Sequence, residues 1–367
     1  MKEKEIISKP QMFMLFLAFI TGSAIINIQG LLIGIAGNGA WVSLLIANTF
    51  GFLILSLVLI LHEKYPNLSF IEYSQALVGK WVTWLIGIPL LLLLFLISAN
   101  ITNAMGFFFT TSMMRETPIY IFQFSILFVG CLTVKAGIEV MARMFQTLLS
   151  LIFLIVLVIL TLNYVHYKPE FLLPVIPNGW KPVFHAAYVG FGFPYMDILY
   201  FTMILPYMSR EKNQKFKSLM FLGLFINGII LAITIVASIM ILGPIVSNEK
   251  FPLFQAARMV ELGELIQRIE FIFGIALIIA TYMKITMMIY IINEVMCQLF
   301  FITSKQSFIF INTLLILLLS LTIYKNDVEL SENGIIMEPL LTFFIGFIPL
   351  LLLFLISLLK NPLSSSR

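Results

Sequence analysis

Two ionisable side chains stand inside long apolar runs of the sequence, where a charge needs a partner or water. Lys284 lies near the middle of the run 268–298, and Asp197 lies in the run 183–207, shortly after Pro194. Desolvating an ionised group is expensive, so a binding or ion-handling role is the default hypothesis for each residue. Lys284 is too far from either end of its run for its ammonium to reach bulk water. It must therefore face protein or an internal water site.

Asp197 and Lys284 each have a structural interpretation beside the functional one. Asp197 falls in the first turn of a helical segment that restarts at Pro194, where a carboxylate compensates exposed backbone N–H groups. It is therefore expected to contact a ligand, to cap the restarted helix, or both. Lys284 is expected either to act in coupling or to be satisfied by backbone carbonyls or by Glu294.

Helix-breaking residues interrupt two of the apolar runs near their middles. The run 11–35 contains Thr21-Gly22-Ser23, and the run 183–207 contains Gly190-Phe191-Gly192-Phe193-Pro194. Paired interruptions of this kind are typical of inverted-repeat transporters, whose discontinuous helices bind substrate at the breaks. Unwound turns expose N–H groups that suit a ligand carboxylate, and the aromatic rings suit an uncharged side chain. The breaks therefore predict a site for a neutral amino acid.

The candidate substrate-binding residues combine both breaks with a polar residue of a third run. Gly22 could instead provide close helix packing, the aromatic rings could face lipid, and Asn100, like Asn103, could bond a neighbouring helix. The predicted substrate-binding set is Thr21, Gly22, Ser23, Asn100, Gly190, Phe191, Gly192, Phe193, Pro194 and Asp197, with Lys284 as the coupling residue.

The composition shows which elements must position these residues. Of the 367 residues, 60% are hydrophobic and 11% are charged, whereas soluble domains carry about 25% charged residues. A membrane-spanning helix needs about 20 mostly apolar residues. We therefore expect an all-α polytopic membrane protein with ten transmembrane helices, at approximately 11–35, 40–61, 82–112, 118–134, 144–163, 183–207, 217–243, 268–298, 307–324 and 338–359.

Ten crossings place both termini on one side of the membrane. The loops on that side carry most of the lysines and arginines, so both termini are predicted to be cytoplasmic. Of the 22 lysines and arginines, only Lys284 falls in the interior of a predicted span. The chain is treated as one transporter-like domain, 1–367, with one repeat at about 11–163 and a second at about 183–359.

Two further helices are predicted at the membrane surface. Phe251 to Leu265 places apolar residues at helical spacing, which predicts a short amphipathic helix on the outer face; an ordinary solvated loop is the alternative. On the inner side, Ser69 is followed three residues later by Glu72. This spacing predicts a capping box at the start of a surface helix.

Several function classes are excluded. The net charge of +4 is too small for a nucleic-acid-binding surface. Cys131 and Cys297 lie in separate apolar runs without metal-ligand spacing, and the histidines are isolated, so no metal and no cofactor is expected. The sequence offers no nucleophile–base set or phosphate-binding loop, so an enzyme is not expected either.

Short motifs along most of the chain resemble the permease-like B subunit of spore germinant receptors. One motif departs from that family: Asn27-Ile28-Gln29 stands where a proline-containing turn is expected, which leaves the path of the second half of the first span open. The matching motifs are Ile7-Ser8-Lys9-Pro10-Gln11, Gly39-Ala40-Trp41-Val42-Ser43, Lys64-Tyr65-Pro66, Glu72-Tyr73, Gly79-Lys80-Trp81, Leu205-Pro206-Tyr207, Arg258 to Leu265, and Gln267-Arg268-Ile269-Glu270.

The resemblance implies a relative of the amino acid/polyamine/organocation transporter superfamily, with a five-plus-five inverted repeat and discontinuous helices 1 and 6. It also implies a nutrient-sensing role in the spore inner membrane, beside a larger A subunit and a C lipoprotein. The family tends to carry an acid near Asp197. In transporters of this architecture a cation site lies between the first and eighth spans, where Lys284 would replace a sodium ion. A working amino acid permease, proton-coupled or uncoupled, is the alternative.

Overall fold

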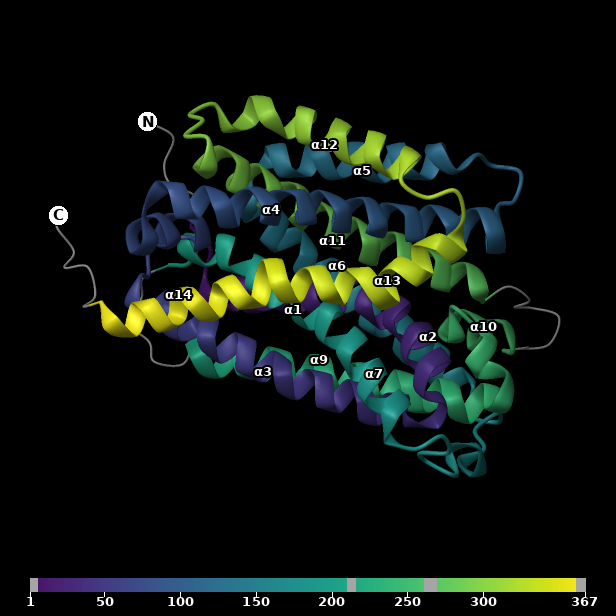
Figure 1. Ribbon diagram of the computed structural model, residues 1–367. Coiled ribbons are helices and arrows are strands. Elements are labelled where there is room, and N and C mark those ends of the chain that lie inside the picture. The colour runs from purple at the N-terminus through teal and green to yellow at the C-terminus, as the bar shows by residue number, and fades with distance from the viewer. Residues whose placement is uncertain (1–5, 210–215, 261–268, 361–367) are drawn as a thin grey trace.

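The computed structural model describes residues 6–209, 216–260 and 269–360, and this part of the chain is built almost entirely of helices (Figure 1). The four short 3₁₀ or π segments used below are η4 (Phe191–Tyr195), η6 (Leu205–Tyr207), η7 (Gly243–Asn248) and η8 (Thr342–Phe347). The α-helices are α1 (Lys9–Thr21), α2 (Ala24–Ala36), α3 (Ala40–Lys64), α4 (Phe70–Phe108), α5 (Ile119–Ala136), α6 (Ile138–Leu162), α7 (Trp180–Gly190), α8 (Asp197–Tyr200), α9 (Phe216–Leu242), α10 (Pro252–Arg258), α11 (Glu270–Leu299), α12 (Lys305–Thr322), α13 (Asp327–Leu341) and α14 (Ile348–Leu359).

Within the described residues, seven helical stretches are long and apolar enough to cross a membrane, so the prediction of an all-helical, multi-pass membrane protein is confirmed at that level. One stretch, Lys9–Lys64, contains two of the predicted spans, and 306–322 forms a further, shorter apolar helix. The sixth predicted span falls on α7, η4 and α8, which are individually too short to qualify. The ten crossings and the inverted repeat stay predictions.

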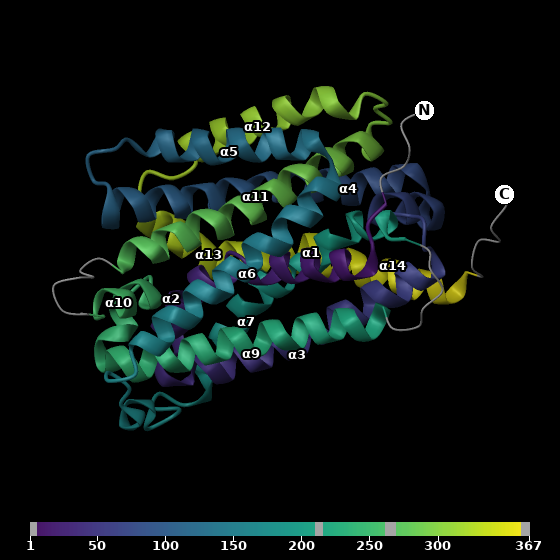
Figure 2. The same ribbon diagram turned by 180° about the vertical axis from the view of Figure 1, so that it is seen from behind.

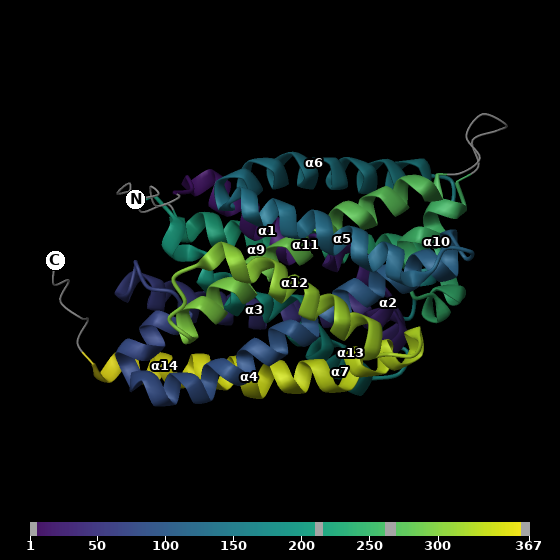
Figure 3. The same cartoon turned by 90° about the horizontal axis from the view of Figure 1, so that it is seen from above.

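Helix α11 forms the centre of the bundle. Its most apolar window is 78% buried, against 28% for the stretch Asp327–Leu359, so α11 is an inner helix and α13–α14 lie at the periphery. It packs against α4, α5, α6 and α12 (Figures 2 and 3). A charged residue in the middle of α11 therefore has protein, not lipid, around it.

The start of α1 and the end of α14 lie at one end of the bundle, and α10 lies at the other (Figure 1). The segment before α1 is fixed to the end of η6 by backbone pairing. The N–H of Ile7 donates to the carbonyl of Tyr207 at 2.8 Å, and the N–H of Ser209 donates to the carbonyl of Ile7 at 2.9 Å. Ser8 then caps α1, since its hydroxyl accepts from the backbone of Gln11 while the Gln11 side chain accepts from the Ser8 N–H.

The predicted capping box at Ser69 is confirmed. Its hydroxyl accepts from the N–H of Glu72 at 3.3 Å, and the Glu72 carboxylate accepts from the N–H of Ser69 at 2.9 Å. The surface helix that begins here turns at Gly79, whose φ of +83° favours a residue without a Cβ. Beyond this turn α4 runs on through the bundle.

Two predicted boundaries differ from the structure. The last span was expected from residue 338, but α13 already begins at Asp327, because Asn326 caps it through the N–H of Glu329. The first residues of α13 are mostly polar, so this part of the helix does not appear as an apolar run in the sequence. The predicted outer helix, 251–265, is helical from Pro252 to Arg258; residues 259 and 260 are not helical, and 261–265 lie outside the described residues.

Candidate functional site

The buried charges of α11 and α8 meet at the centre of the bundle. The ammonium of Lys284 forms an ion pair with the carboxylate of Asp197 and donates to the carbonyl oxygen of Phe19 at 3.0 Å. It also lies 3.9 Å from the centroid of the Phe19 ring, a distance that allows a cation–π contact. The two charged side chains are 0% and 3% exposed. Lys284 therefore joins α11 to the first and sixth predicted spans at once.

The backbone of the sixth span explains how Asp197 reaches this position. Helix α7 ends at Gly190, and Phe193 leaves helical geometry with φ −141° and ψ 125°. Pro194 cannot continue an α-helical ladder, and α8 starts at Asp197. Asp197 thus stands in the first turn of the restarted helix, as expected, with its carboxylate turned to Lys284.

The sequence singled out both charges but did not predict that they pair. Glu294, the carboxylate considered as a partner for Lys284, instead lies 3.5 Å from the side chain of Gln298. The pairing could have been suggested by charge balance, because Asp197 and Lys284 are the opposite charges that stand deepest inside predicted spans. Oppositely charged groups buried in a low-dielectric interior are expected to lie together.

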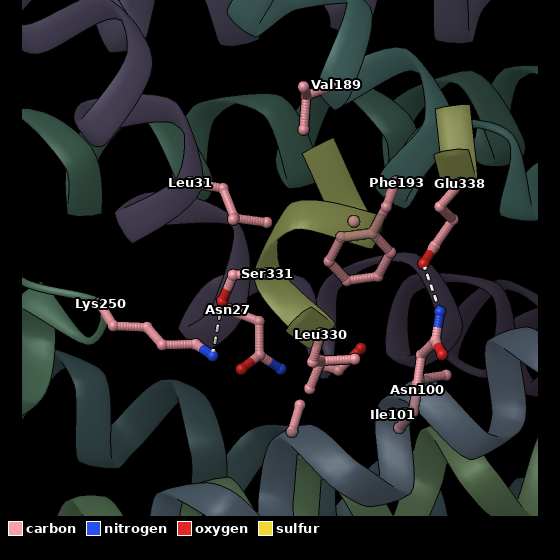
Figure 4. A pocket seen from close by; sticks show the side chains of 13 residues that line it. Asn27, Leu31, Asn100, Ile101, Val189, Phe193, Lys250, Leu330, Ser331 and Glu338 are labelled. Atoms are coloured by element: carbon pink, nitrogen blue, oxygen red, sulfur yellow. Dashed lines mark hydrogen bonds between the residues drawn. The ribbon is translucent and has the colours of Figure 1, made fainter. Parts of the chain in front are cut away.

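A pocket of about 100 Å³ opens beside both breaks (Figure 4). The first break contributes Ser23, and the second contributes Phe193. Helices α2, α4, α7 and α13 and the segment after η7 supply the other lining residues, which are Asn27, Leu31, Asn100, Ile101, Ala104, Val189, Lys250, Leu330, Ser331, Gly334 and Glu338. The pocket thus contains three of the predicted substrate-binding residues: Ser23, Asn100 and Phe193.

The polar groups of the pocket lie at two places. At one, Asn100 donates from its amide to the carboxylate of Glu338 at 2.9 Å. At the other, Lys250 forms an ion pair with Asp327 and donates to the hydroxyl of Ser331 at 3.0 Å. Figure 4 shows the two contacts well apart, the one between Lys250 and Ser331 on the left and the one between Asn100 and Glu338 on the right. Ser23 adds a hydroxyl that is buried and has no hydrogen-bond partner in the described part of the chain.

Glu338 was not predicted as a site residue. Glu338 stands at the predicted edge of the last span, where a carboxylate is ordinary, but α13 begins earlier and so contains Glu338 in its interior. The same shift brings Leu330, Ser331 and Gly334 to the pocket. A predicted helix at 327–341, capped by Asn326, would have placed Leu330, Ser331, Gly334 and Glu338 on one element.

The three glycines at the breaks allow close approach of neighbouring helices. A Cβ on Gly22 would lie 3.4 Å from the carbonyl oxygen of Ala280, on α11, and one on Gly190 would lie 2.9 Å from the Cβ of Ala47. A Cβ on Gly192 would come within 2.7 Å of the Cα of Pro339. The packing alternative given for Gly22 therefore has direct geometric support, and none of the three glycines lines the pocket.

Four other predicted substrate-binding residues also lie outside the pocket, namely Thr21, Phe191, Pro194 and Asp197, the last of which pairs with Lys284. Thr21 accepts a hydrogen bond from the amide of Asn227 at 3.0 Å. Pro194 is buried, and Phe191 lines a separate, apolar recess. The rings of Phe343 and Phe347 lie about 6 Å from that of Phe191.

The remaining polar candidates connect helices. The Oδ1 atom of Asn103 accepts from the side chain of Gln123 at 2.8 Å, which joins α4 to α5. The departure at Asn27-Ile28-Gln29 does not bend the chain, because α2 continues through it to Ala36. Gln29 accepts from Ser238 of α9 at 3.0 Å, and Asn27 faces the pocket.

Among the described residues, no three His, Cys, Asp or Glu side chains gather as a metal site would require.

Broken helices, a buried ion pair between α8 and α11 and an adjoining pocket define a transporter-like membrane protein. The fold agrees with two solved structures. MhsT in complex with L-phenylalanine matches with a TM-score of 0.70 at 15% identity, over 96% of this chain and 89% of the other. Mhp1, a nucleobase-cation-symport-1 family transporter in a closed conformation with bromovinylhydantoin bound, matches with a TM-score of 0.74 at 12% identity, over 99% and 95%.

The chain belongs to the spore germination protein family, whose spore permease model matches residues 6–328. It is 28% identical over 342 residues to spore germination protein KB of Bacillus subtilis (strain 168), which covers 92% of this chain and 90% of the relative. It is 25% identical over 290 residues to spore germination protein XB of Bacillus anthracis, over 77% and 80% of the two chains. The family predicted from the short motifs is thereby confirmed.

Proposed function

We propose that this protein is the nutrient-sensing subunit of a spore germinant receptor, and that it binds a neutral amino acid in the pocket between its broken first and sixth spans. The observation that carries the proposal is the position of Lys284. A single side chain holds the carbonyl of Phe19 before the first break and the carboxylate of Asp197 after the second. A ligand bound beside both breaks would shift the Phe19 carbonyl and the Asp197 carboxylate, which the Lys284 ammonium connects.

The ligand class follows from the chemistry of the lining. The pocket combines an unpartnered hydroxyl from Ser23, an amide from Asn100 and apolar walls from Phe193, Val189 and Ile101. A few placed polar groups in an apolar cavity are typical of small-molecule sites. The fold match to MhsT with L-phenylalanine adds support for an amino acid.

The receptor assignment includes several further proposals. The two repeats, about 11–163 and 183–359, form a ten-helix inverted repeat in the spore inner membrane, with both termini in the cytoplasm. An A subunit and a C lipoprotein receive the signal. Family membership and the transporter fold support these assignments.

An amino acid permease, proton-coupled or uncoupled, is the second candidate, and the transporter folds that this chain matches favour it. Binding and uptake of radiolabelled amino acids by the same reconstituted sample, with and without partner subunits, separates the two. A receptor binds without transport, and its response needs the partners. Uptake by the chain alone supports the permease and contradicts the receptor.

Phe193 and Phe191 offer a matched pair for testing the pocket. Phe193→Ala is expected to reorder the affinities for neutral amino acids, because the ring forms part of the wall. Phe191→Ala removes a ring of the same size from the separate apolar recess and is expected to leave the order unchanged. Competition binding with a panel of the neutral amino acids measures both. Sugars and nucleosides are tested in the same assay. If they bind and amino acids do not, the proposed ligand class, a neutral amino acid, is contradicted.

The activity is expected to be independent of sodium. The ammonium of Lys284 lies 3.0 Å from the Phe19 carbonyl, where a cation between the first and eighth spans would otherwise bind. A sodium ion about 4 Å from that ammonium would be repelled by roughly 4 kcal/mol at an effective dielectric constant of 20. Nutrient responses in sodium-free and sodium-rich buffer at fixed ionic strength should therefore agree, and a clear sodium requirement would overturn this role of Lys284.

A further inference from the structure

A half-buried carboxylate in the pocket has no cationic partner among the described residues. Glu338 lines the pocket from α13, and its hydrogen bond comes from the neutral amide of Asn100. The ion pairs of the described chain do not include it, since Lys250 pairs with Asp327 and Lys284 with Asp197. An ionised carboxylate away from bulk water is stable only when it is paired or well hydrogen-bonded.

A directional chain of hydrogen bonds ends on this carboxylate. The amide of Asn333 donates to the hydroxyl of Tyr324 at 2.5 Å, that hydroxyl donates to Asn100 at 2.9 Å, and the Asn100 amide donates to Glu338 at 2.9 Å. Burial, with the charge of Glu338, raises the pKa of Tyr324 to about 12, so the phenol keeps its proton and remains a donor. The chain fixes the Asn100 amide and leaves further lone pairs of the carboxylate for a ligand.

The charges around the breaks are unbalanced. Glu338 lies within electrostatic reach of Asp197 and Lys284, so this part of the bundle holds two carboxyl groups and one ammonium. One more positive charge would neutralise the cluster, and in a low-dielectric pocket that charge would be bound strongly. Lys250 is not available for this role because Asp327 and Ser331 already hold it.

A second observation indicates a ligand at the same place. Ser23 lines the pocket as a residue that is only 1% exposed, and its buried hydroxyl has no hydrogen-bond partner in the described chain. Ser23 precedes α2, so a carboxylate bound there would also meet the positive end of that helix. The pocket thus offers a site for an anion at Ser23 and one for a cation at Glu338.

We propose that Glu338 and Asn100 form the ammonium-recognition site of the ligand pocket, opposite a carboxylate site at Ser23, so that the pocket selects zwitterionic amino acids over their des-amino analogues. This inference rests on the proposed function, because it assigns the ligand contacts within that same pocket. Glu338 is a ligand-contact residue, and Tyr324 and Asn333 position its partner Asn100.

Ligand pairs that differ only in the ammonium group test the proposal. The unchanged protein, reconstituted with its partner subunits, is expected to bind the best neutral amino acid of a full panel at least 10-fold more tightly than the matching des-amino acid. L-phenylalanine against 3-phenylpropanoate and L-valine against 3-methylbutanoate are two such pairs. Glu338→Gln is expected to weaken amino acid binding roughly 10- to 100-fold, as for the loss of a charge-assisted hydrogen bond, and to abolish the discrimination within each pair.

Two controls keep the result interpretable. Glu332→Gln changes an exposed carboxylate on the same helix and should alter neither affinity nor discrimination. Glu338→Asp keeps the charge, so it should keep the preference for the ammonium-bearing partner even if affinity falls. Glu338→Gln could still bind amino acids and prefer them over the des-amino acids as strongly as the unchanged protein does. That result would overturn the inference and leave the proposed function standing. Failure of every amino acid to bind the unchanged protein would overturn the proposed function, and the inference with it.

Discussion

Asp197→Asn is expected to lower the free energy of unfolding by about 3–5 kcal/mol, the usual effect of removing one member of a buried ion pair. The asparagine preserves the shape of the side chain and an acceptor oxygen, so the loss comes from the ammonium of Lys284, which would remain buried without its negative counter-charge. Thermal and denaturant unfolding of the purified protein in detergent, with the unchanged chain alongside, measures the effect.

An exposed ion pair of the same chain provides the control. Lys217 and Glu63 lie 2.6 Å apart with side chains that are 40% and 58% exposed. Glu63→Gln should change the unfolding free energy by less than about 1 kcal/mol, because water screens both charges. Equal, small effects of Asp197→Asn and Glu63→Gln would show that the inner pair is not desolvated as the structure has it.

The double variant Asp197→Leu, Lys284→Met is expected to recover most of the stability and none of the nutrient response. Apolar residues of similar volume often replace a buried ion pair at no cost, or with a gain of about 1–4 kcal/mol. The connection between the first and sixth spans would be lost, however, because neither new side chain can donate to Phe19 or accept from α11.

Stability and response must be measured on the same double variant, the first in detergent and the second as nutrient-triggered germination of spores that also carry the partner subunits. If the double variant is stable but gives no response, Asp197 and Lys284 are needed for signalling and not for folding. A stable double variant that responds normally would show that Asp197 and Lys284 serve the fold alone, as the capping interpretation of Asp197 allowed.

Local signals in the sequence predicted the local features well. The capping box of Ser69 and Glu72 depends on residues three positions apart, and the break at Gly190 to Pro194 depends on backbone chemistry within a few residues. The charges Asp197 and Lys284 were recognisable because each stands alone among apolar neighbours. None of these features needed knowledge of the tertiary arrangement.

The features that the sequence did not predict depend on tertiary contacts. Nothing in the run around Lys284 identifies Asp197 as its partner, since the two are joined only when α11 packs against the sixth span. Gly22 and Gly192 were predicted as ligand contacts, and the structure adds that Ala280 and Pro339 approach them closely, which the sequence alone could not show. Glu338 was missed because the polar first half of α13 does not resemble a membrane helix in sequence.

The backbone pairing of Ile7 with the end of η6 has a mechanical consequence. Two hydrogen bonds act in parallel there, from Ile7 to Tyr207 and from Ser209 to Ile7, so the segments cannot slide past one another without breaking both. Ile7 continues into the helix that carries Phe19, and Tyr207 ends the stretch that carries Asp197. The two broken spans are therefore linked twice, once by Lys284 at mid-depth and once by this tether at the end of the bundle. A movement of one broken span relative to the other would therefore have to break or carry along both connections.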